Sequence, residues 1–456
     1  MSNFKAGFAR VDITPPIGTP LVGYYEKRVS DGILDPLYVT AVAVNDGEST
    51  ALIISVDCVG ISAEISNDIR SQIVNACGVE FDKIFLSSTH THLGPGMSDI
   101  YAEGIRCLDV VDMIIKKIIG VSKLAISDMK EAEMFVNEGY APVDISFVRT
   151  FRMKDGTVAT NPGIGNPEVD SPIGEADQRV ALTCFKRENA PEIAIINFQT
   201  HCDTIAGKKI SADYPYFVRT IFEELIPDTR CLYICGAQGN TAGGNVFFTD
   251  DMLNMIKTDK DGYGRNTRNI GRTIACTAAS LYGVARRAEP CPIAAASVDV
   301  VLEHNKAKNA EELEESRKIK ALYDANKHGQ IPVPFGHTGM TRTAIIAEAT
   351  KNITLESLPD TKTVTVTGIR IGDFALVGFP GEPFTEIGKR VREASDYKMT
   401  FISCLANGSE GYYPSRTVME AGSYGYEYRT AKYKIGTDDR LVDGGVEVLE
   451  KLKGQN

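Results

Sequence analysis

Short apolar runs in this chain repeatedly end in polar clusters. Four such runs occupy residues 83–88, 192–198, 231–235 and 374–379, and turn-forming and polar residues follow each of them at once. Runs of that length between turn residues are typical of buried strands. Ligands of α/β proteins gather at the carboxyl ends of such strands. The pattern therefore predicts a binding or catalytic site where these runs end.

The rest of the pattern predicts helices and one hairpin around these strands. Residues 37–57 are expected to form a hairpin that turns at 45–47, because its Asp-Gly pair supplies the positive φ angles of a tight turn. Apolar residues recur at helical spacing in residues 62–77, 109–127, 213–225 and 268–286. Further strands are predicted at 146–153, 157–160, 362–379 and 399–405. The expected fold class is α/β.

One segment stands apart from this alternation. Residues 309–327 form a highly charged, amphipathic pattern with many opposite-charge neighbours, which is typical of an exposed helix. We assign it to a helical insertion or peripheral subdomain at about residues 300–350. Candidate site residues are spread from 57 to 424, so no division of the chain would leave a complete site on one side. A single domain over residues 1–456 is therefore expected.

Composition narrows the classes of partner. The chain has 456 residues, of which 43% are hydrophobic, and a formal net charge of −11. A negative charge disfavours non-specific binding to nucleic acid and to anionic membranes. No apolar run approaches the ~20 residues of a membrane span, and the N-terminus lacks a signal-peptide pattern. We expect a cytoplasmic protein with a small-molecule substrate, and homo-oligomerisation stays open.

The ten cysteines support the same expectation. They are scattered without a CxxC pair, and several lie inside apolar runs. Free cysteine behaves there as a small hydrophobic residue, and a reducing compartment is indicated rather than a disulfide framework. Cys202 directly follows His201 and its thiolate would be a strong zinc ligand. We interpret it as a packing residue.

Histidines and a carboxylate follow three of the four runs. His90 and His92 come after the first run, His201 after the second and Glu382 after the fourth. These are ligands of a zinc-type site. A carboxylate placed directly after a buried run needs a partner or a metal to be buried. The ends of the runs therefore predict a metal-dependent enzyme.

His90 and His92 pose a geometric question. Alternate residues of an extended strand point to opposite faces, so both can bind one metal only if the chain has left the strand. The following Gly94-Pro95-Gly96 permits such a turn. The spacing favours one histidine as a ligand and the other as a neighbour or proton carrier.

Several motifs together resemble a known family. They are residues 6–15, Ser55-Val56-Asp57, residues 89–96, Gly381-Glu382-Pro383 and residues 407–412. The His-Thr-His-x-Gly-Pro-Gly stretch at 90–96 is the most specific of them. Over nearly its whole length the chain resembles the catalytic domain of the neutral (non-lysosomal) ceramidases. The resemblance implies a layered mixed β-sheet core with flanking helices.

The resemblance also implies roles for individual residues. One Zn²⁺ per chain would be held by His90, His201, Glu382 and Tyr412. His92 matches the second histidine of the family's motif. Arg149 and Tyr424 match, on weaker local similarity, an arginine and a tyrosine of the family's active site.

One loop departs from the family's pattern. Where ceramidases read Gly-Asp-Val-Ser-Pro-Asn, with a catalytic serine beside the zinc, this chain reads Gly239-Asn240-Thr241-Ala242-Gly243-Gly244-Asn245. Ala242 stands at the serine position and removes the hydroxyl, while Thr241 would point the other way on an extended loop. Ceramide is a membrane lipid, and we expect a small polar substrate instead.

Three functions remain open on this sequence. The first is a zinc-dependent hydrolase of an amide or ester bond, in which the metal activates water and polarises a carbonyl. His92 or Asp203 would act as general base or acid, Arg149 or Tyr424 would stabilise an oxyanion, and the substrate would be bound by Asn240, Gly243 and Gly244. The second is a metal-dependent lyase or isomerase acting on a sugar-like substrate. The third is a non-catalytic, metal-containing binding protein. We favour the first.

Overall fold

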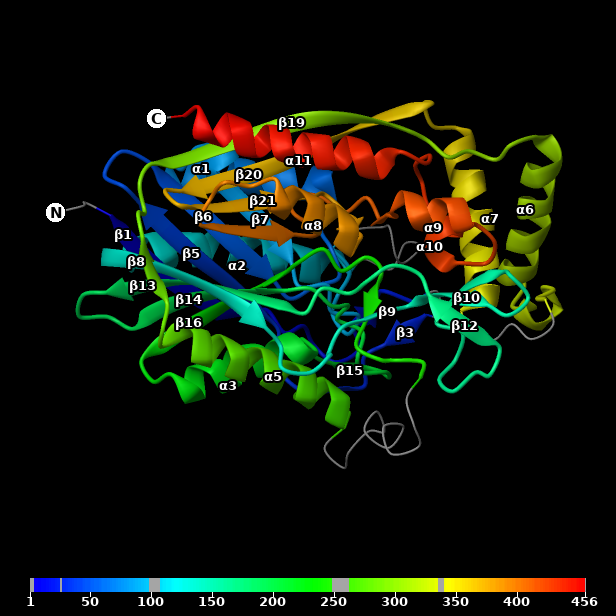
Figure 1. Cartoon of the computed structure of the whole chain (residues 1–456), viewed down its shortest axis with the longest axis horizontal. Helices are drawn as coiled ribbons and strands as arrows, with labels where there is room; N and C mark the ends of the chain where they lie inside the picture. Colours follow the sequence, from blue (N-terminus) through cyan, green and yellow to red (C-terminus); the bar gives the residue numbers. More distant parts are fainter. Residues whose placement is uncertain (1–3, 25–26, 98–106, 248–261, 335–339, 456) are drawn as a thin grey trace.

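Two β-sheets form the centre of the fold and helices cover their outer faces (Figure 1). The computed structural model describes residues 4–24, 27–97, 107–247, 262–334 and 340–455. The larger sheet has nine strands in the order β16-β14-β13-β8-β1-β5-β6-β7, with β18 beside β8. Its strands are β1 Lys5–Asp12, β5 Tyr38–Asn45, β6 Thr50–Val56, β7 Ile84–Ser88, β8 Lys130–Tyr140, β13 Arg179–Arg187, β14 Glu192–Phe198, β16 Thr229–Cys235 and β18 Arg286–Ala288.

The second sheet packs on the first. Its strand order is β19-β20-β21-β23, with bounds Ile293–Glu303, Thr361–Ile371, Phe374–Gly378 and Met399–Ser403. Val42 and Ile195 of the large sheet share one buried cluster with Leu376 and Phe401 of the second sheet. The apolar faces of the two sheets therefore form the central core, as in other sheet-on-sheet packings.

Helices close the two outer faces. On the large sheet lie α1 Ala63–Cys77, α2 Leu108–Ser127, α3 Tyr214–Leu225 and α5 Arg265–Tyr282. On the second sheet lie α8 Thr385–Glu393 and α11 Thr437–Lys453. The layers are thus helix, sheet, sheet and helix, and the predicted α/β class with a layered mixed sheet is confirmed.

A peripheral helix pair extends from one end of the molecule (Figure 1). In sequence, the helices α6 Ala310–Asp324 and α7 Thr341–Glu356 lie between strands β19 and β20, and they pack against each other. Only Ser316 of α6 is buried. Helix α7 also contacts α10 Tyr426–Thr430, which follows the short helix α9 Arg416–Ala421. Through α10, the peripheral pair reaches the segment that supplies part of the site.

Short strands frame the region where the site lies. The segments β10 Thr150–Met153 and β11 Val158–Thr160 pair antiparallel, and β12 Val169–Pro172 pairs with β10. Two-residue pairs complete the frame, namely β2 Pro20–Leu21 with β3 Arg28–Val29, β4 Gly32–Ile33 with β15 Lys209–Ile210, β9 Phe147–Val148 with β17 Thr241–Ala242, and β22 Glu382–Pro383 with β24 Tyr412–Tyr413.

Most predicted elements are present. Strands β5 and β6 form the expected hairpin, in which Asn45 pairs with Thr50 and Gly47 has φ +100°. The predicted helices correspond to α1, α2, α3 and α5, and Ser62 caps α1 by accepting a hydrogen bond from the backbone N–H of Ile65. Residues 362–379 contain two antiparallel strands that turn at Gly372, where φ is +53°.

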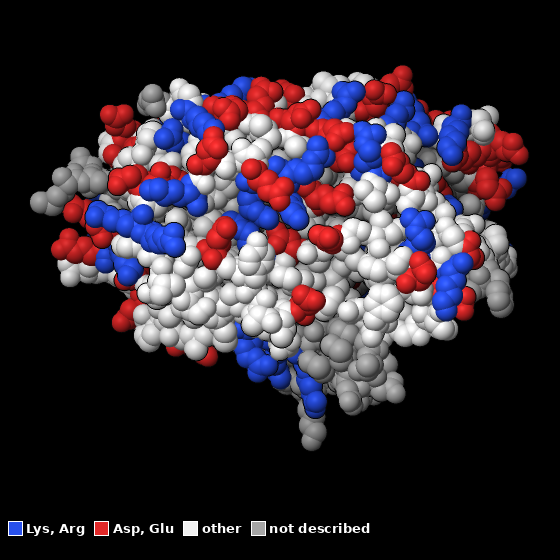
Figure 2. All heavy atoms as spheres, in the orientation of Figure 1, with Lys and Arg blue, Asp and Glu red and all other residues white. Residues whose placement is uncertain are grey.

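The surface and the cysteines add two observations. Lys and Arg side chains are interspersed with Asp and Glu on the face shown in Figure 2, which differs from the basic stripe typical of nucleic-acid-binding proteins. None of the ten cysteines, all of which lie in the described ranges, forms a disulfide. Among the described residues, none of the helices combines the length and the apolar character needed to cross a bilayer.

Candidate metal centre

The ends of several strands meet at one place in the fold. Strands β7 and β16 are the two edges of the large sheet, yet the Ser55 hydroxyl on β6 donates to the carbonyl of Tyr233 on β16 at 2.7 Å. The segment after β23 lies between the two edges, since Ala406 bridges to Ser87 and the Cys404 N–H donates to the Cys235 carbonyl. The four apolar runs therefore end in one region, as the sequence predicted.

Three imidazoles face one another in this region. The Nε2 atom of His90 lies 3.0 Å from Nε2 of His201 and 3.2 Å from Nε2 of His92. All three side chains are buried, and their nitrogens lie within 4.8 Å of one another. His90 and His92 lie side by side, which the sequence allowed only if the chain had left the strand. His90 has φ +72°, so the strand has already ended at this residue.

Glu382 and Tyr412 complete the cluster. Glu382 Oε2 lies 3.1 Å from His90 Nε2 and 3.9 Å from His201 Nε2, and the Tyr412 hydroxyl lies 3.4 Å from His201 Nε2. Donors bound to zinc at ~2.0–2.1 Å in a tetrahedron stand about 3.3 Å apart. The donor atoms expected from the resemblance are therefore spaced as a zinc-type ion requires.

The backbone fixes His90 for this role. Its Nδ1 lies 2.6 Å from the Val59 carbonyl, and a carbonyl can only accept, so Nδ1 carries the proton and Nε2 keeps a lone pair. A positive φ is uncommon for histidine and costs free energy. The surrounding contacts, including the hydrogen bond from the His90 N–H to the Cys58 carbonyl, hold it there.

Glu382 and Tyr412 are held as a pair. They lie opposite each other in the small parallel pair β22–β24, and the Glu382 N–H donates to the Gly411 carbonyl at 2.8 Å. A Cβ on Gly381 would come within 2.5 Å of the Tyr413 ring, so this turn requires glycine. Gln238, which sequence reasoning missed, donates from Nε2 to Glu382 Oε2 at 3.2 Å.

Electrostatics favour neutral imidazoles at two of the three positions. Burial and the charge of nearby Arg149 hold the pKa of His201 well below its ordinary value. Burial, His90 and Arg28 do the same to the pKa of His92. Burial alone would lower the pKa of His90, but Glu382 raises it above the usual value. A neutral imidazole at His201 and the Glu382 carboxylate are suited to a metal, and His90 must give up any proton on Nε2 to join them.

Arg149 is buried beside the cluster. Its guanidinium lies 5.1 Å from the centre of the Tyr412 ring, and its Nε lies 2.7 Å from Oε1 of Glu427. Burial alone would lower the pKa of Arg149, but Tyr412 and Glu427 raise it, so the group stays charged. Glu427 is fully buried and was not identified from the sequence.

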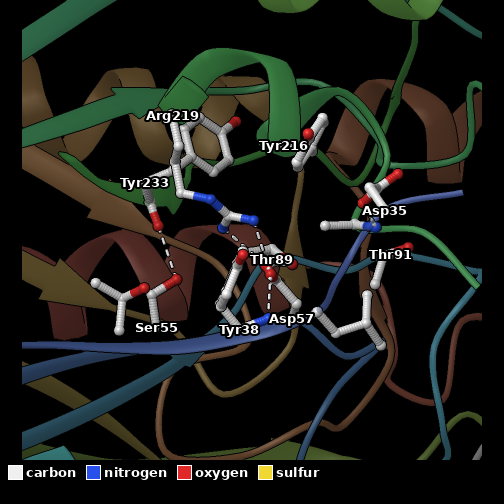
Figure 3. Close-up of polar contacts among 12 residues, drawn as sticks. Asp35, Tyr38, Ser55, Asp57, Thr89, Thr91, Tyr216, Arg219 and Tyr233 are labelled. Carbon is white, nitrogen blue, oxygen red and sulfur yellow. Dashed lines mark hydrogen bonds and ion pairs between the residues drawn. The ribbon is translucent and has the colours of Figure 1, made fainter. Parts of the chain in front are cut away.

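A second buried ion pair supports the His90 loop (Figure 3). The two terminal nitrogens of Arg219, Nη1 and Nη2, donate to the two carboxylate oxygens of Asp57 at 2.9 and 2.7 Å. The Thr89 hydroxyl and the Tyr38 N–H also donate to this carboxylate. Asp57 thereby ties helix α3 and strand β5 to the residue just before His90.

Asp203 lies next to the histidines but is already engaged. It accepts a hydrogen bond from the Tyr24 hydroxyl, and burial, with the charge of Asp213, raises the pKa of Asp203 well above its usual value. The Tyr24 ring meets the His92 ring edge-on, with centroids 5.3 Å apart. Tyr24 was not identified from the sequence, although it follows Gly23, which has φ +104° and touches His92.

The residues expected to bind substrate have different surroundings. Asn240 Oδ1 accepts from the Thr385 N–H and hydroxyl, both at 2.9 Å. A Cβ on Gly243 would meet Ile270 and Thr204, so this glycine serves close packing, whereas Gly244 faces open space. The Tyr424 N–H donates to the Val158 carbonyl, its backbone bridges to Ala159, and its ring lies beneath the Arg429 guanidinium.

The remaining loop residues match their sequence interpretation. Ala242 is half-buried on β17, and the Thr241 hydroxyl donates to the Gln238 carbonyl at 3.0 Å, so it does not replace a serine. Cys202 is fully buried, and burial raises the pKa of its thiol well above the usual value. Cys202 belongs to a buried apolar cluster with Phe198 and Tyr214, which agrees with its interpretation as a packing residue.

Two solved structures share this fold. A ceramidase complexed with C2 has a TM-score of 0.72 at 16% sequence identity, over 100% of this chain and 76% of that chain. The neutral ceramidase from Pseudomonas aeruginosa has a TM-score of 0.70 at 17% identity, over 99% of this chain and 75% of that chain. The predicted resemblance is confirmed at the level of fold. No family model matches the chain.

Proposed function

We propose that this protein is a zinc-dependent hydrolase that cleaves an amide or ester bond in a small, soluble substrate. The single observation that carries the proposal is the convergence of His90, His201, Glu382 and Tyr412, whose donor atoms stand 3.0–3.9 Å apart along the measured pairs. The ceramidase-like fold supports amide hydrolysis by analogy.

A zinc ion bound by these residues would lower the pKa of a bound water to about 7 and polarise a carbonyl. His92 stands beside the donors as a neutral imidazole, so its Nε2 can accept a proton from an attacking water and return it to the leaving group. The Arg149 guanidinium is fixed, charged and shielded from water, and it can stabilise negative charge on a substrate oxygen.

The substitution at Ala242 shapes this mechanism. The hydroxyl that ceramidases place here is missing, and the neighbouring Thr241 hydroxyl donates its hydrogen bond to the Gln238 carbonyl. Of the three loop residues expected to bind substrate, Gly244 faces open space and is the best placed to do so, while Asn240 and Gly243 hold the loop through Thr385, Ile270 and Thr204. Proton transfer would come from His92. Asp203 and Tyr24 add polar groups beside His92, which suit a polar substrate better than a lipid.

The polar surroundings also favour a second candidate. Tyr24, Asp203 and Arg149 could hold the hydroxyls of a sugar-like substrate while a metal-dependent lyase or isomerase reaction takes place. A non-catalytic, metal-containing binding protein is the third. A cytoplasmic location and homo-oligomerisation stay predictions.

The test uses the zinc-loaded full chain and a panel of small amides, esters, lactones and sugar acids. We expect turnover of a member of the panel, with one oxygen atom from ¹⁸O-labelled water in the product. Turnover without oxygen incorporation would establish the lyase or isomerase instead. Binding of a panel member without turnover would establish the binding protein.

A further inference from the structure

A polar cavity lies outside the group of candidate metal donors. Its volume is about 420 Å³, which is within the ~300–1,000 Å³ range of small-molecule sites. It opens between α1, strand β20 and the two loops that precede Glu382 and Tyr412. Lining residues that matter here are Arg70, Lys362, Thr367, Asn407 and Glu410.

The floor of the cavity is polar and ordered. Thr367, Asn407 and Glu410 are each at most 9% exposed. The Asn407 side chain accepts from the Leu86 N–H at 3.0 Å and donates to the Thr367 hydroxyl at 3.3 Å. Glu410 accepts from the Tyr433 hydroxyl at 3.2 Å. Hydroxyl, amide and carboxylate groups held in fixed positions are suited to bind hydroxyl groups of a ligand.

Arg70 gives the cavity a buried positive charge. Its side chain is 6% exposed and stacks on Phe81 at 3.8 Å. Its nearest carboxylate among the described residues is Asp82, at 3.8 Å, whose own side chain is 66% exposed. The Arg70 Nε atom is buried without a hydrogen-bond partner. Arg70 Nη2 donates to the Phe81 carbonyl at 2.9 Å and Nη1 to Asn67 Oδ1 at 3.4 Å, and both partners are neutral. A desolvated cation whose carboxylate partner is distant and largely exposed favours an anionic group of a ligand.

Lys362 adds a second cation at the rim. Its Nζ lies 2.7 Å from Glu410 Oε1, and its side chain is 44% exposed. The ammonium neutralises the carboxylate of the floor, so an anionic ligand would not meet an uncompensated negative charge. The cavity thus combines a floor for hydroxyl groups with a buried cation in its wall.

We propose that this cavity is a second ligand site, which binds a small polyhydroxylated compound with one anionic group, a carboxylate or a phosphate. It shares two loops with the metal cluster, since the Glu410 N–H donates to the Pro380 carbonyl and the Glu382 N–H to the Gly411 carbonyl. It shares no metal-donor atom with that cluster. Binding here therefore requires neither a metal nor catalytic activity.

The test is isothermal titration calorimetry on the metal-free full chain with two matched pairs of probes. Gluconate is compared with sorbitol, and inositol monophosphate with inositol. We expect at least one anion to bind ~10-fold or more tightly than its uncharged partner and than acetate, a difference of about 1.4 kcal/mol. Preference for gluconate would indicate a carboxylate ligand, and preference for inositol monophosphate a phosphate ligand.

Variants decide where the anion binds. Arg70→Gln and the exposed-rim variant Lys362→Gln should each weaken binding of that anion several-fold, while Lys320→Gln on α6, a lysine that is likewise paired with a carboxylate, should not. His90→Ala should leave the affinity unchanged. Anions that bind no better than sorbitol, inositol or acetate would overturn the proposal. Undiminished binding in both Lys362→Gln and Arg70→Gln would overturn it too, as would loss of binding in His90→Ala. These outcomes leave the hydrolase proposal unaffected.

Discussion

Glu427 forms an ion pair with Arg149 beside the candidate metal donors: its Oε1 lies 2.7 Å from the Arg149 Nε. The other carboxylate oxygen accepts the hydroxyls of Thr150, at 3.2 Å, and Thr160. Both charged side chains are buried. The arginine that would stabilise a substrate oxygen is therefore held in place by a residue in α10, close to the peripheral helix pair.

Replacing Glu427 by Gln should leave a buried, uncompensated guanidinium. We expect the free energy of unfolding to fall by roughly 3 kcal/mol, since breaking a buried ion pair costs ~3–5 kcal/mol. Urea denaturation measures this. The double variant Arg149→Met/Glu427→Gln should recover part of the loss. A double variant no more stable than the additive sum would show that the two residues do not interact.

Asp35 should make stability depend on pH. Burial raises the pKa of Asp35 from 3.8 to about 6, against hydrogen bonds from Ser211, Ala212 and Tyr263. A carboxyl whose pKa is higher in the folded state binds more protons there, so its contribution to stability is present below pH 3.8 and is lost as pH rises through 6. The loss amounts to about 3 kcal/mol.

The measurement for Asp35 is unfolding by urea across that pH range. Asp35→Asn should remove about 3 kcal/mol of the loss of stability between pH 3.8 and 6. The remaining pH dependence comes from other carboxyls, such as Asp203, whose pKa burial also raises. Asp396→Asn, at an exposed site, serves as the control. An identical pH dependence in wild type and Asp35→Asn would contradict the assignment.

Gln238 should tune the affinity for the metal without binding it. Its Nε2 donates to Glu382 Oε2, and loss of such an orienting partner lowers metal affinity by about 10–100-fold. Gln238→Met conserves volume and should lower zinc affinity to that extent, measured by competition with a chelator. Asn352→Leu, at a buried amide on α7, is the matched control and should bind zinc as the wild type does.

His92 should separate metal binding from catalysis. If it transfers protons, His92→Gln retains one zinc per chain and loses turnover by about 10²–10⁴-fold. Zinc content and turnover are measured on the same preparation. Loss of zinc in His92→Gln would instead make His92 a ligand, as its 3.2 Å distance from His90 Nε2 also permits.

The sequence was sufficient for the strands and their ends. Apolar runs such as 192–198 are bounded by turn residues, and their burial in a sheet follows from hydrophobicity alone. The candidate metal donors were identified because His90, His201 and Glu382 each follow such a run. Tyr412 came only from the family resemblance, since a loop tyrosine carries no signal of its own.

The relations between distant segments were not predictable in the same way. Alternation alone left open whether His90 and His92 face the same point, because the answer depends on where the strand ends. His90 adopts φ +72° and is held there by long-range contacts. Glu427 and Gln238 act through partners far away in sequence, Arg149 and Glu382. A single polar residue in a helix or loop does not reveal its partner, which only the folded chain brings near.

The central claim is that His90, His201, Glu382 and Tyr412 form a zinc site. Elemental analysis of the purified full chain, together with His90→Ala and Glu382→Ala, tests it most directly. The account predicts about one zinc per chain in the wild type and its loss in both variants, which circular dichroism should show to be folded. A folded wild-type protein that takes up no zinc, or variants that retain it, would contradict the account.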